Sequence, residues 1–319
     1  MQPDSTGTDS TPALNVLTDQ LKFPEGPIAM SDGSVILVEI ARGTLSRVRD
    51  GNIEVIAEVG GGPNGAAIGP DGKCYICNNG GFNWIERDGR LYPGEEPTNY
   101  AGGRIERVDL ETGEIEVLFS HCNGQPLRGP NDIVFDKFGG FWFTDHGKTR
   151  ARERDRTGVF YAKSDGSYIE EVIFPMEGPN GIGLSADEDE LYIAETVPGR
   201  VWAFKLEAPG KLATTGSGGK GAPGDRRLLI DRPGYHLFDS LAVDSEGGVC
   251  VATIIDGGIT VLSPTGGSPK FVPMPDRLTT NICFGGADLK TAFITLSSTG
   301  QLVAMDWDVA GLPLNFLNK

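Results

Sequence analysis

One pattern of residues recurs six times along this chain of 319 residues, and it constrains the fold more than any other feature. Each copy has a polar residue, a short apolar strand, a turn rich in Gly and Asp, and a second apolar strand. The clear copies are "GPNGAAIGPDGKCYICNNGG" from Gly62, "GPNDIVFDKFGGFWFTDHG" from Gly129 and "GPNGIGLSADEDELYIAET" from Gly178, and weaker copies start at Phe23, Phe238 and Thr280. The chain is therefore expected to consist of six similar units.

Two further segments with strand character follow most copies, as in "GTLSRVRDGNIEVIAEV" from Gly43, where "RDGN" is a hairpin signal. Four antiparallel strands in a unit of about 40 to 50 residues are typical of a propeller blade. We therefore predict an all-β fold, a six-bladed β-propeller over residues 13–319. The last unit lacks one strand, and "ALNVLTDQ" (13–20) is expected to supply it and close the ring. Residues 1–12 are interpreted as a disordered tail.

The fixed polar residue of each copy is predicted to face the central channel. In a blade the first strand starts at one face of the disc and the second strand returns to that face. The residues that precede the first strands should then converge at one mouth of the channel; they are Glu25, Asn64, Asn131, Asn180, Asp239 and Asn281. The loop 82–103 is expected to overhang this mouth as a lid, and the insertion 207–225 is expected on the opposite face.

Carboxylate and amide oxygens gathered in this way suit Ca²⁺, Mg²⁺ or Mn²⁺. The two carboxylates, Glu25 and Asp239, would repel one another without a cation between them. An alternative interpretation is that Asn and Asp serve here as turn formers that bond their own backbone. That interpretation fits Asn64 and Asn281 best.

The segments "FPEGP", "GPNGAAIGPDGKCYI", "GPNDIVFDKFGGFWFTD", "GPNGIGLSADEDELYIAET", "FDSLAVD" and "TNICFGGADLKTAFIT" together resemble the senescence-marker-protein/gluconolactonase/luciferin-regenerating-enzyme family. The resemblance covers roughly residues 20–305, and the order and spacing of the motifs are more specific than any single one. It implies a six-bladed propeller with one divalent metal ion in its channel, for which Ca²⁺ is the first expectation and Mg²⁺, Mn²⁺ or Zn²⁺ are alternatives.

Site residues follow from the same resemblance. It implies that Glu25, Asn180 and Asp239 hold the metal, that Asn131 contacts metal or substrate, and that Asp239 is also the base. Arg128, three residues before Asn131, is a candidate substrate clamp, and His146 is a candidate substrate-binding residue where bacterial relatives often have Pro. The chain also departs from many members in having Ser240 after Asp239.

Composition excludes several other classes of protein. A net charge of −16 disfavours binding to nucleic acid. No apolar run of about 18 residues predicts a membrane span, and the polar N-terminus and five Cys residues predict a cytoplasmic location with reduced thiols. Neither a G-x-S-x-G nucleophile motif nor a phosphate-binding loop is present.

The sequence therefore predicts a divalent-metal-dependent hydrolase whose substrate is a small lactone, such as a sugar or hydroxy-acid lactone. A bound cation polarises a lactone carbonyl, and Asp239 accepts the proton of the attacking water. Two alternatives remain open at this point. One is an esterase or phosphotriesterase that uses the same site, and the other is a non-catalytic calcium-binding propeller whose metal is structural.

Overall fold

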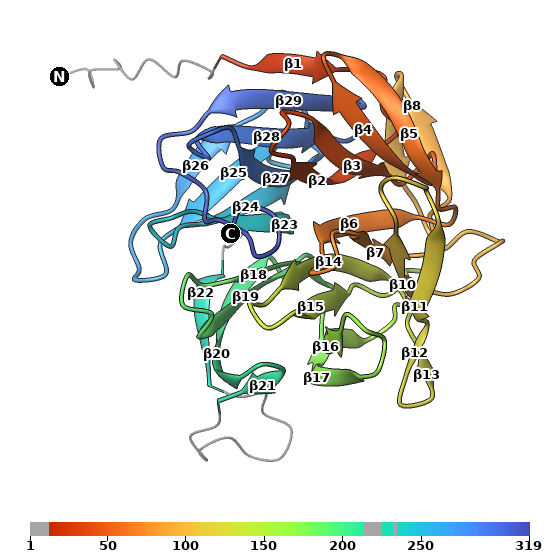
Figure 1. Ribbon diagram of the computed structural model, residues 1–319, viewed down its shortest axis with the longest axis vertical. Coiled ribbons are helices and arrows are strands. Elements are labelled where there is room, and N and C mark those ends of the chain that lie inside the picture. Colours follow the sequence, from red (N-terminus) through yellow and green to blue (C-terminus); the bar gives the residue numbers. More distant parts are fainter. Residues whose placement is uncertain (1–12, 214–224, 232–234) are drawn as a thin grey trace.

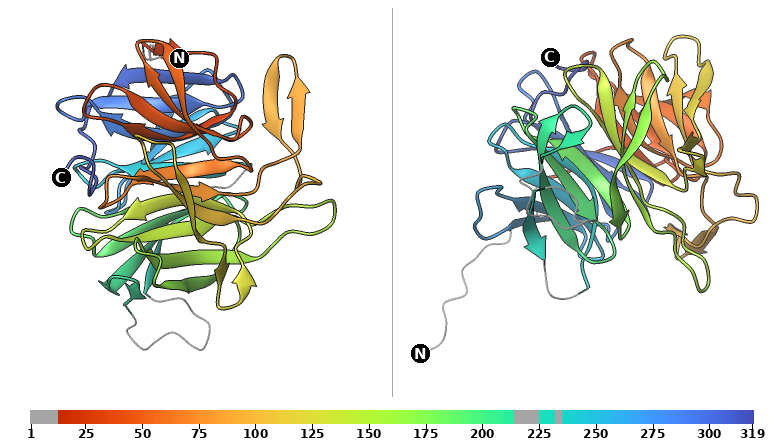
Figure 2. Two further views of the ribbon diagram at one scale, coloured as in Figure 1. Left: turned by 45° about the vertical axis from the view of Figure 1, so that its right-hand side comes forward. Right: turned by 90° about the horizontal axis from the view of Figure 1, so that it is seen from below.

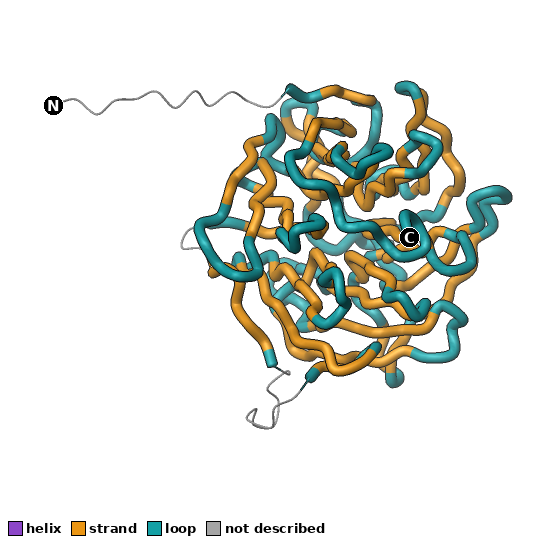
Figure 3. The backbone as a smooth tube through the Cα atoms, turned by 60° about the vertical axis from the view of Figure 1, so that its left-hand side comes forward, coloured by secondary structure: helices purple, strands orange, loops and turns teal. Residues whose placement is uncertain are grey.

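A computed structural model describes residues 13–213, 225–231 and 235–319. The predicted tail at 1–12 and most of the insertion at 207–225 lie outside these residues. The described residues form strands, loops and turns without any helix, as Figure 3 shows, and none of them belongs to a helix that could cross a membrane. The prediction of an all-β fold is confirmed.

Six antiparallel sheets are arranged around a common centre as the blades of a propeller (Figure 1). Blade 1 contains β2 (Pro24–Ala29), β3 (Val35–Glu39), β4 (Thr44–Arg49) and β5 (Asn52–Glu58). Blade 2 contains β6 (Pro63–Ile68), β7 (Cys74–Asn78), β10 (Arg104–Val108) and β11 (Ile115–Phe119). Blade 3 contains β14 (Pro130–Phe135), β15 (Gly140–Asp145), β16 (Thr157–Lys163) and β17 (Ile169–Met176).

The remaining blades follow the same plan. Blade 4 contains β18 (Pro179–Leu184), β19 (Glu190–Glu195), β20 (Arg200–Ala208) and β22 (Arg226–Asp231), with the short β21 (Lys211–Leu212) paired to β20. Blade 5 contains β23 (Leu237–Val243), β24 (Val249–Ile254), β25 (Gly258–Leu262) and β26 (Lys270–Pro273). Blade 6 contains β27 (Thr279–Gly285), β28 (Thr291–Leu296) and β29 (Gln301–Asp306).

The N-terminal strand β1 (Asn15–Thr18) completes blade 6. It pairs antiparallel with β29, with Asn15 opposite Ala304, so that blade 6 is built from both ends of the chain. This pairing covers the edge that β29 would otherwise expose. The prediction that the N-terminal segment closes the ring is confirmed.

The apolar core lies between neighbouring blades. In β15, Phe141 and Phe143 pack with Tyr75 of blade 2, whereas Trp142 packs with Ile182 of blade 4. Successive side chains of a strand point to opposite faces of the sheet. A strand of a blade that packs between two neighbouring blades is therefore apolar on both of its faces. This burial explains the continuous run Phe-Trp-Phe in the sequence and fixes each blade against the next.

Residues 82–103, for which a lid was expected, do not belong to a blade and are here called the lid. They include the hairpin of β8 (Trp84–Arg87) and β9 (Arg90–Pro93), which projects from the disc in the left view of Figure 2. The backbone N–H of Leu91 donates to the carbonyl of Ser298 in blade 6 (3.1 Å). On the other side, the N–H of Glu96 donates to the carbonyl of Thr149 in blade 3 (3.0 Å). The lid is therefore fixed at two separate points on the rim of the propeller.

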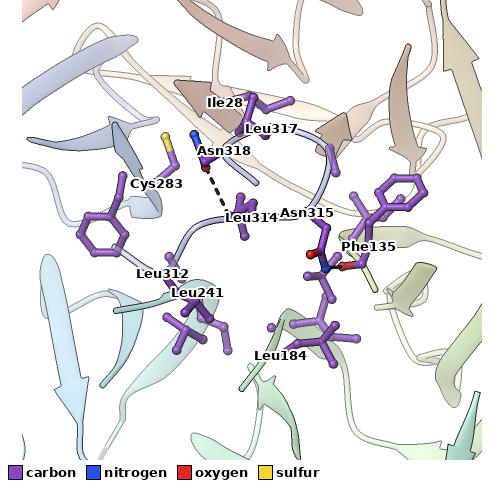
Figure 4. A pocket seen from close by; sticks show the side chains of 18 of the residues that line it. Ile28, Phe135, Leu184, Leu241, Cys283, Leu312, Leu314, Asn315, Leu317 and Asn318 are labelled. Carbon is purple, nitrogen blue, oxygen red and sulfur yellow. Dashed lines mark hydrogen bonds between the residues drawn. The ribbon is translucent and has the colours of Figure 1, made fainter. Parts of the chain in front are cut away.

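The C-terminal segment 311–319 lies across the end of the channel where the innermost strands finish (Figure 4). The N–H of Leu312 donates to the carbonyl of Val243, and the side-chain amide of Asn315 donates to the carbonyl of Phe135 (3.1 Å). A largely apolar cavity of about 110 Å³ separates this segment from the innermost strands. The sequence repeat did not predict this closure, because the segment lies outside the repeat.

Candidate functional site

All six innermost strands depart from regular pairing at their polar residue. The register with the second strand shifts at Glu25–Ile28, Pro63–Ala66, Pro130–Ile133, Pro179–Ile182, Phe238–Leu241 and Thr279–Asn281. A β-bulge bends the strand and re-aims the side chains next to it. Each repeated polar residue therefore lies at a β-bulge, and the bulge takes the side chain of that residue out of the regular pleat of the blade.

Glycine after the polar residue lets neighbouring innermost strands approach closely at this level. A Cβ atom on Gly26 would lie 2.6 Å from the carbonyl oxygen of Asn64, and Gly26 also has a φ of +53°. A Cβ atom on Gly181 would lie 2.6 Å from the carbonyl oxygen of Asp239. These distances are too short for any side chain, so Gly at this place brings the polar residues of adjacent blades together.

Glu25 is the most enclosed carboxylate of the group, with 2% of its surface exposed. Its Oε2 accepts hydrogen bonds from the N–H of Gly26 (3.0 Å) and from Nδ2 of Asn281 (2.8 Å). Asn281 in turn accepts the N–H of Ile282 at its Oδ1 (2.8 Å). Asn281 therefore bonds the backbone of its own strand, as the turn interpretation expects, but it also lies within β27 and orients Glu25, so it is not a turn residue alone.

Asp239 in blade 5 is partly exposed and interacts electrostatically with Glu25 in blade 1. Burial raises the pKa of Asp239 well above its ordinary value, and the negative charge of Glu25 raises it further. Burial also raises the pKa of Glu25. Two carboxylates in such a place are stable together when a proton or a cation offsets their charge.

Two amide oxygens of the ring have no hydrogen-bond donor. Oδ1 of Asn131 and Oδ1 of Asn180 are buried and unpartnered, whereas Nδ2 of Asn180 donates to Oγ1 of Thr196 (3.1 Å). Buried polar atoms are nearly always paired in folded proteins, and each exception calls for an explanation. Oxygen atoms that lack a donor are the ligands that a hard divalent cation takes up.

A third carboxylate, Asp132, was missed by the sequence analysis as a member of this group. Its Oδ1 accepts the N–H of Ile133 (2.9 Å), and its Oδ2 accepts the N–H of Ile182 in blade 4 (3.4 Å). Burial raises the pKa of Asp132 to about 7, with a further contribution from the charge of Glu25. The signal was available, since Asp132 occupies the place where three of the six copies have Gly.

The donor set fits an oxygen-liganded metal ion. No group of three or more His, Cys, Asp or Glu side chains that could hold a metal occurs in the described part of the chain. A metal centre here therefore depends on the amides of Asn131 and Asn180 as well as on the carboxylates of Glu25 and Asp239. Two carboxylates and two neutral oxygens match the preference of Ca²⁺ or Mg²⁺.

Other acids near the mouth have a structural role. Oε2 of Glu39 accepts the N–H of Lys22 (2.7 Å), and Oε1 of Glu195 accepts the N–H of Glu177 (2.8 Å). Asp145 accepts the N–H groups of Arg128 and Gly129, both at 2.7 Å. Each of these acids ends the second strand of its blade and holds the chain that enters the first strand.

Arg128 and His146 lie on the blade 3 side of the mouth. The carbonyl of Arg128 accepts the hydroxyl of Tyr100 in the lid (2.5 Å), and its guanidinium makes no hydrogen bond or ion pair to any described residue. Nε2 of His146 lies 3.2 Å from Nη2 of Arg154. Burial, together with the charges of Arg154 and Lys148, lowers the pKa of His146 to about 3, so the imidazole is neutral.

Lys148 connects blade 3 to the lid, and the sequence analysis missed it. The side chain is buried, and its Nζ donates to the carbonyl of Gly81 (2.5 Å) and to Oδ1 of Asn79 (3.3 Å). The ammonium group also lies 4.2 Å from the ring centre of Phe82. Its contacts place the start of the lid beside the mouth.

Comparison with known proteins agrees with this architecture. Residues 23–298 match the sequence model described as the SMP-30/Gluconolactonase/LRE-like region. The chain is 25% identical to the gluconolactonase of Zymomonas mobilis, over 90% of this chain and 80% of that protein. It is 27% identical to the lactonase drp35 of Staphylococcus epidermidis, over 77% of this chain and 68% of that protein.

More distant relatives share the fold. A regucalcin from Agrobacterium tumefaciens, described as a calcium-binding protein, superposes with a TM-score of 0.74 over 97% of this chain and 98% of that one, at 18% identity. A gluconolactonase from Xanthomonas campestris gives a TM-score of 0.71 over 92% and 89%, at 23% identity. The diisopropyl-fluorophosphatase of Loligo vulgaris is 24% identical over 61% of this chain and 63% of that protein.

Proposed function

Because the chain belongs to the SMP-30/gluconolactonase/LRE-like family, we propose that it is a hydrolase that opens the ring of a lactone. Relatives named gluconolactonase and lactonase support this reaction class. The substrate is a small cyclic ester, such as a sugar or hydroxy-acid lactone, that enters at the mouth beside the lid. The observation that carries the proposal is the pair of buried, unpartnered amide oxygens of Asn131 and Asn180 next to two carboxylates.

The residues that would hold the cofactor are Glu25, Asn131, Asn180 and Asp239, and the ion is one divalent cation, with Ca²⁺ as the first candidate. The calcium-binding protein among the relatives of the same fold is consistent with this choice. When bound, such a cation polarises an ester carbonyl and offsets the negative charge that develops on its oxygen. Asn281 contributes indirectly by holding the Glu25 carboxylate in one orientation.

Asp239 is the general base in this proposal. Glu25 is fully enclosed and already accepts two hydrogen bonds, so it is poorly placed to receive a proton from a water molecule. Asp239 is less enclosed than Glu25 and lies in the same ring of residues. It can therefore take a proton from the water that attacks the carbonyl and return it to the leaving alkoxide.

The blade 3 side of the mouth supplies the groups that orient the substrate. The guanidinium of Arg128 is free to donate to oxygen atoms of the lactone, and the amide of Asn131 is a neutral donor nearby. His146 is neutral and bonded to Arg154, so it contributes a polar wall rather than a charge. A pKa of about 3 leaves the imidazole without the added proton that a general acid donates near neutral pH and makes it a weak base, so both roles are disfavoured.

The test of the reaction class is proton release in weak buffer from several ester substrates. The panel contains gluconolactone, γ-butyrolactone and dihydrocoumarin, a linear ester of matched size, and diisopropyl fluorophosphate, because one relative is a phosphatase of that compound. The proposal predicts release from at least one lactone and little from the linear ester. Turnover of the fluorophosphate alone would instead assign the site to phosphotriester chemistry, and no turnover with a metal ion bound would favour a non-catalytic role.

A further inference from the structure

Arg154 is a cation at the mouth of the channel that forms no ion pair with any acid in the described part of the chain. Its Nε is buried and has no hydrogen-bond acceptor, and its only polar side-chain contact among the described residues is Nη2 to Nε2 of His146. Burial lowers the pKa of its guanidinium, and the charge of Glu177 acts in the opposite direction. A half-buried guanidinium normally has a carboxylate beside it.

The acids near Arg154 are engaged elsewhere. Glu177 lies 3.6 Å from Arg156, and Asp155 lies 2.9 Å from Arg150. Asp155 also accepts the N–H of Lys148 (3.0 Å). His146 cannot supply a negative charge. The charge of Glu177 acts on Arg154 from a distance, but no described carboxylate forms an ion pair with it, so the loop presents a guanidinium to which no acid is bonded.

The backbone holds Arg154 in this position. Thr149 and Arg154 form an isolated antiparallel bridge, and the N–H of Arg150 donates to the carbonyl of Glu153 (2.8 Å), so the loop is closed on itself. Its guanidinium packs on Gly178, where a Cβ atom would lie 2.1 Å from Nη2. Gly178 is two residues before Asn180, a span of about 7 Å at most. Arg154 is therefore adjacent to the candidate site.

We propose that Arg154, oriented by His146, forms an anion-binding subsite that receives a carboxylate of the ligand. A planar guanidinium with a free edge matches a carboxylate better than it matches hydroxyl groups. The carboxylate has two possible sources. It is either a substituent of the lactone or the group that ring opening creates, and the second source rests on the proposed lactone hydrolysis.

The first experiment measures binding, which does not depend on turnover. Isothermal titration calorimetry with 2-hydroxyglutarate and with 4-hydroxybutyrate compares wild type with Arg154→Met and Arg156→Met. Arg156 is the matched control, because it is exposed and lies near Glu177. The subsite predicts that Arg154→Met weakens binding of at least one acid by at least tenfold and that Arg156→Met leaves both unchanged. Equal binding by a folded Arg154→Met protein would overturn the proposal, and Arg154→Gln replaces it if Met impairs folding.

The second experiment distinguishes the two sources of the carboxylate by kinetics. It compares γ-butyrolactone with the same ring carrying a carboxylate, 5-oxotetrahydrofuran-2-carboxylate. If the substrate carries the anion, Arg154→Met raises KM for the charged lactone at least tenfold and leaves KM for the neutral lactone unchanged. If ring opening creates it, KM stays the same for both while inhibition by 4-hydroxybutyrate weakens. Arg154-dependent binding of the acids without hydrolysis of either lactone would retain the subsite and leave these two lactones outside the proposed function.

Discussion

Asn281 and Asn131 show that one residue type serves two purposes in the same ring. Both lie at the bulge of an innermost strand, and both are buried. The side-chain amide of Asn281 donates to Glu25 and accepts the N–H of Ile282. Oδ1 of Asn131, in contrast, accepts no hydrogen bond. The sequence repeat cannot separate these roles, because they depend on which neighbour lies opposite.

Replacement of Asn131 by Leu separates stability from metal binding. Removal of the unpartnered Oδ1 should stabilise the metal-free protein by about 1 to 3 kcal/mol, because that oxygen is buried without a hydrogen bond. The same change removes a candidate ligand, so added Ca²⁺ should no longer raise Tm. Thermal unfolding in EDTA and in Ca²⁺ measures both effects.

Asn78→Leu is the matched control for that substitution. Oδ1 of Asn78 accepts the N–H of Gly62, and Nδ2 donates to the carbonyl of Gly60 and to Glu106, all at 2.9 Å. Its loss leaves buried groups unpaired, so the variant should be less stable with or without Ca²⁺. If both variants lose stability in EDTA to the same extent, Asn131 is a structural residue.

Asp239→Asn tests the assignment of the base. The amide keeps the shape of the side chain but cannot accept the proton, so kcat should fall by roughly 10² to 10⁴. The fold should persist, because Asp239 is partly exposed and lies in a bulge rather than in the packed part of its blade. Steady-state kinetics and circular dichroism on the same preparation check the two statements. Turnover within threefold of wild type would remove Asp239 from the mechanism.

At the scale of elements, Lys148 links the blade 3 loop to the start of the lid. Burial lowers the pKa of Lys148 to about 7, whereas an unfolded lysine titrates near 10.5. Between these pH values the unfolded chain binds one more proton than the folded chain, so the free energy of unfolding rises with pH through this window. The full effect is about 1.4 kcal/mol per pH unit.

Lys148→Met should remove this dependence. From about pH 7.5 to about pH 9.5, the stability of wild type relative to the variant is expected to rise by roughly 2 kcal/mol. Urea unfolding at several pH values measures it, with the exposed Lys137→Met as the control that should follow wild type. If the free energy of unfolding of wild type and of Lys148→Met changes with pH in parallel, Lys148 is not desolvated in the way its contacts indicate.

At the scale of the whole molecule, the repeat was sufficient to predict the propeller. Six copies with a fixed polar residue imply six equivalent strands around an axis, and the unpaired N-terminal strand had one free edge to join. The same argument predicted the meeting of Glu25, Asn131, Asn180 and Asp239, because equivalent places in a closed ring face one another. Their roles as ligands, and the role of Asp239 as base, stay predictions.

Features outside the repeat could not be predicted in this way. A lid at 82–103 was expected, but its contacts with Ser298 and Thr149 were not, because these residues are distant in sequence and carry no local signal. The C-terminal segment crosses the channel through contacts of Leu312 and Asn315 with two different blades. Arg154 lies in a polar loop and looks like any other surface arginine in the sequence, and only the structure shows that no described carboxylate is bonded to it.

In the proposed mechanism, one divalent ion in the ring of innermost strands is required for lactone opening. The most direct test follows Ca²⁺ content and lactone hydrolysis on the same EDTA-stripped samples as free Ca²⁺ is raised. We predict that the rate increases in proportion to the occupancy of a single site per chain, and that Asn180→Leu lowers both together. Full activity in protein that holds no metal ion, or saturation of one site with no change in rate, would contradict a requirement for the ion in lactone opening.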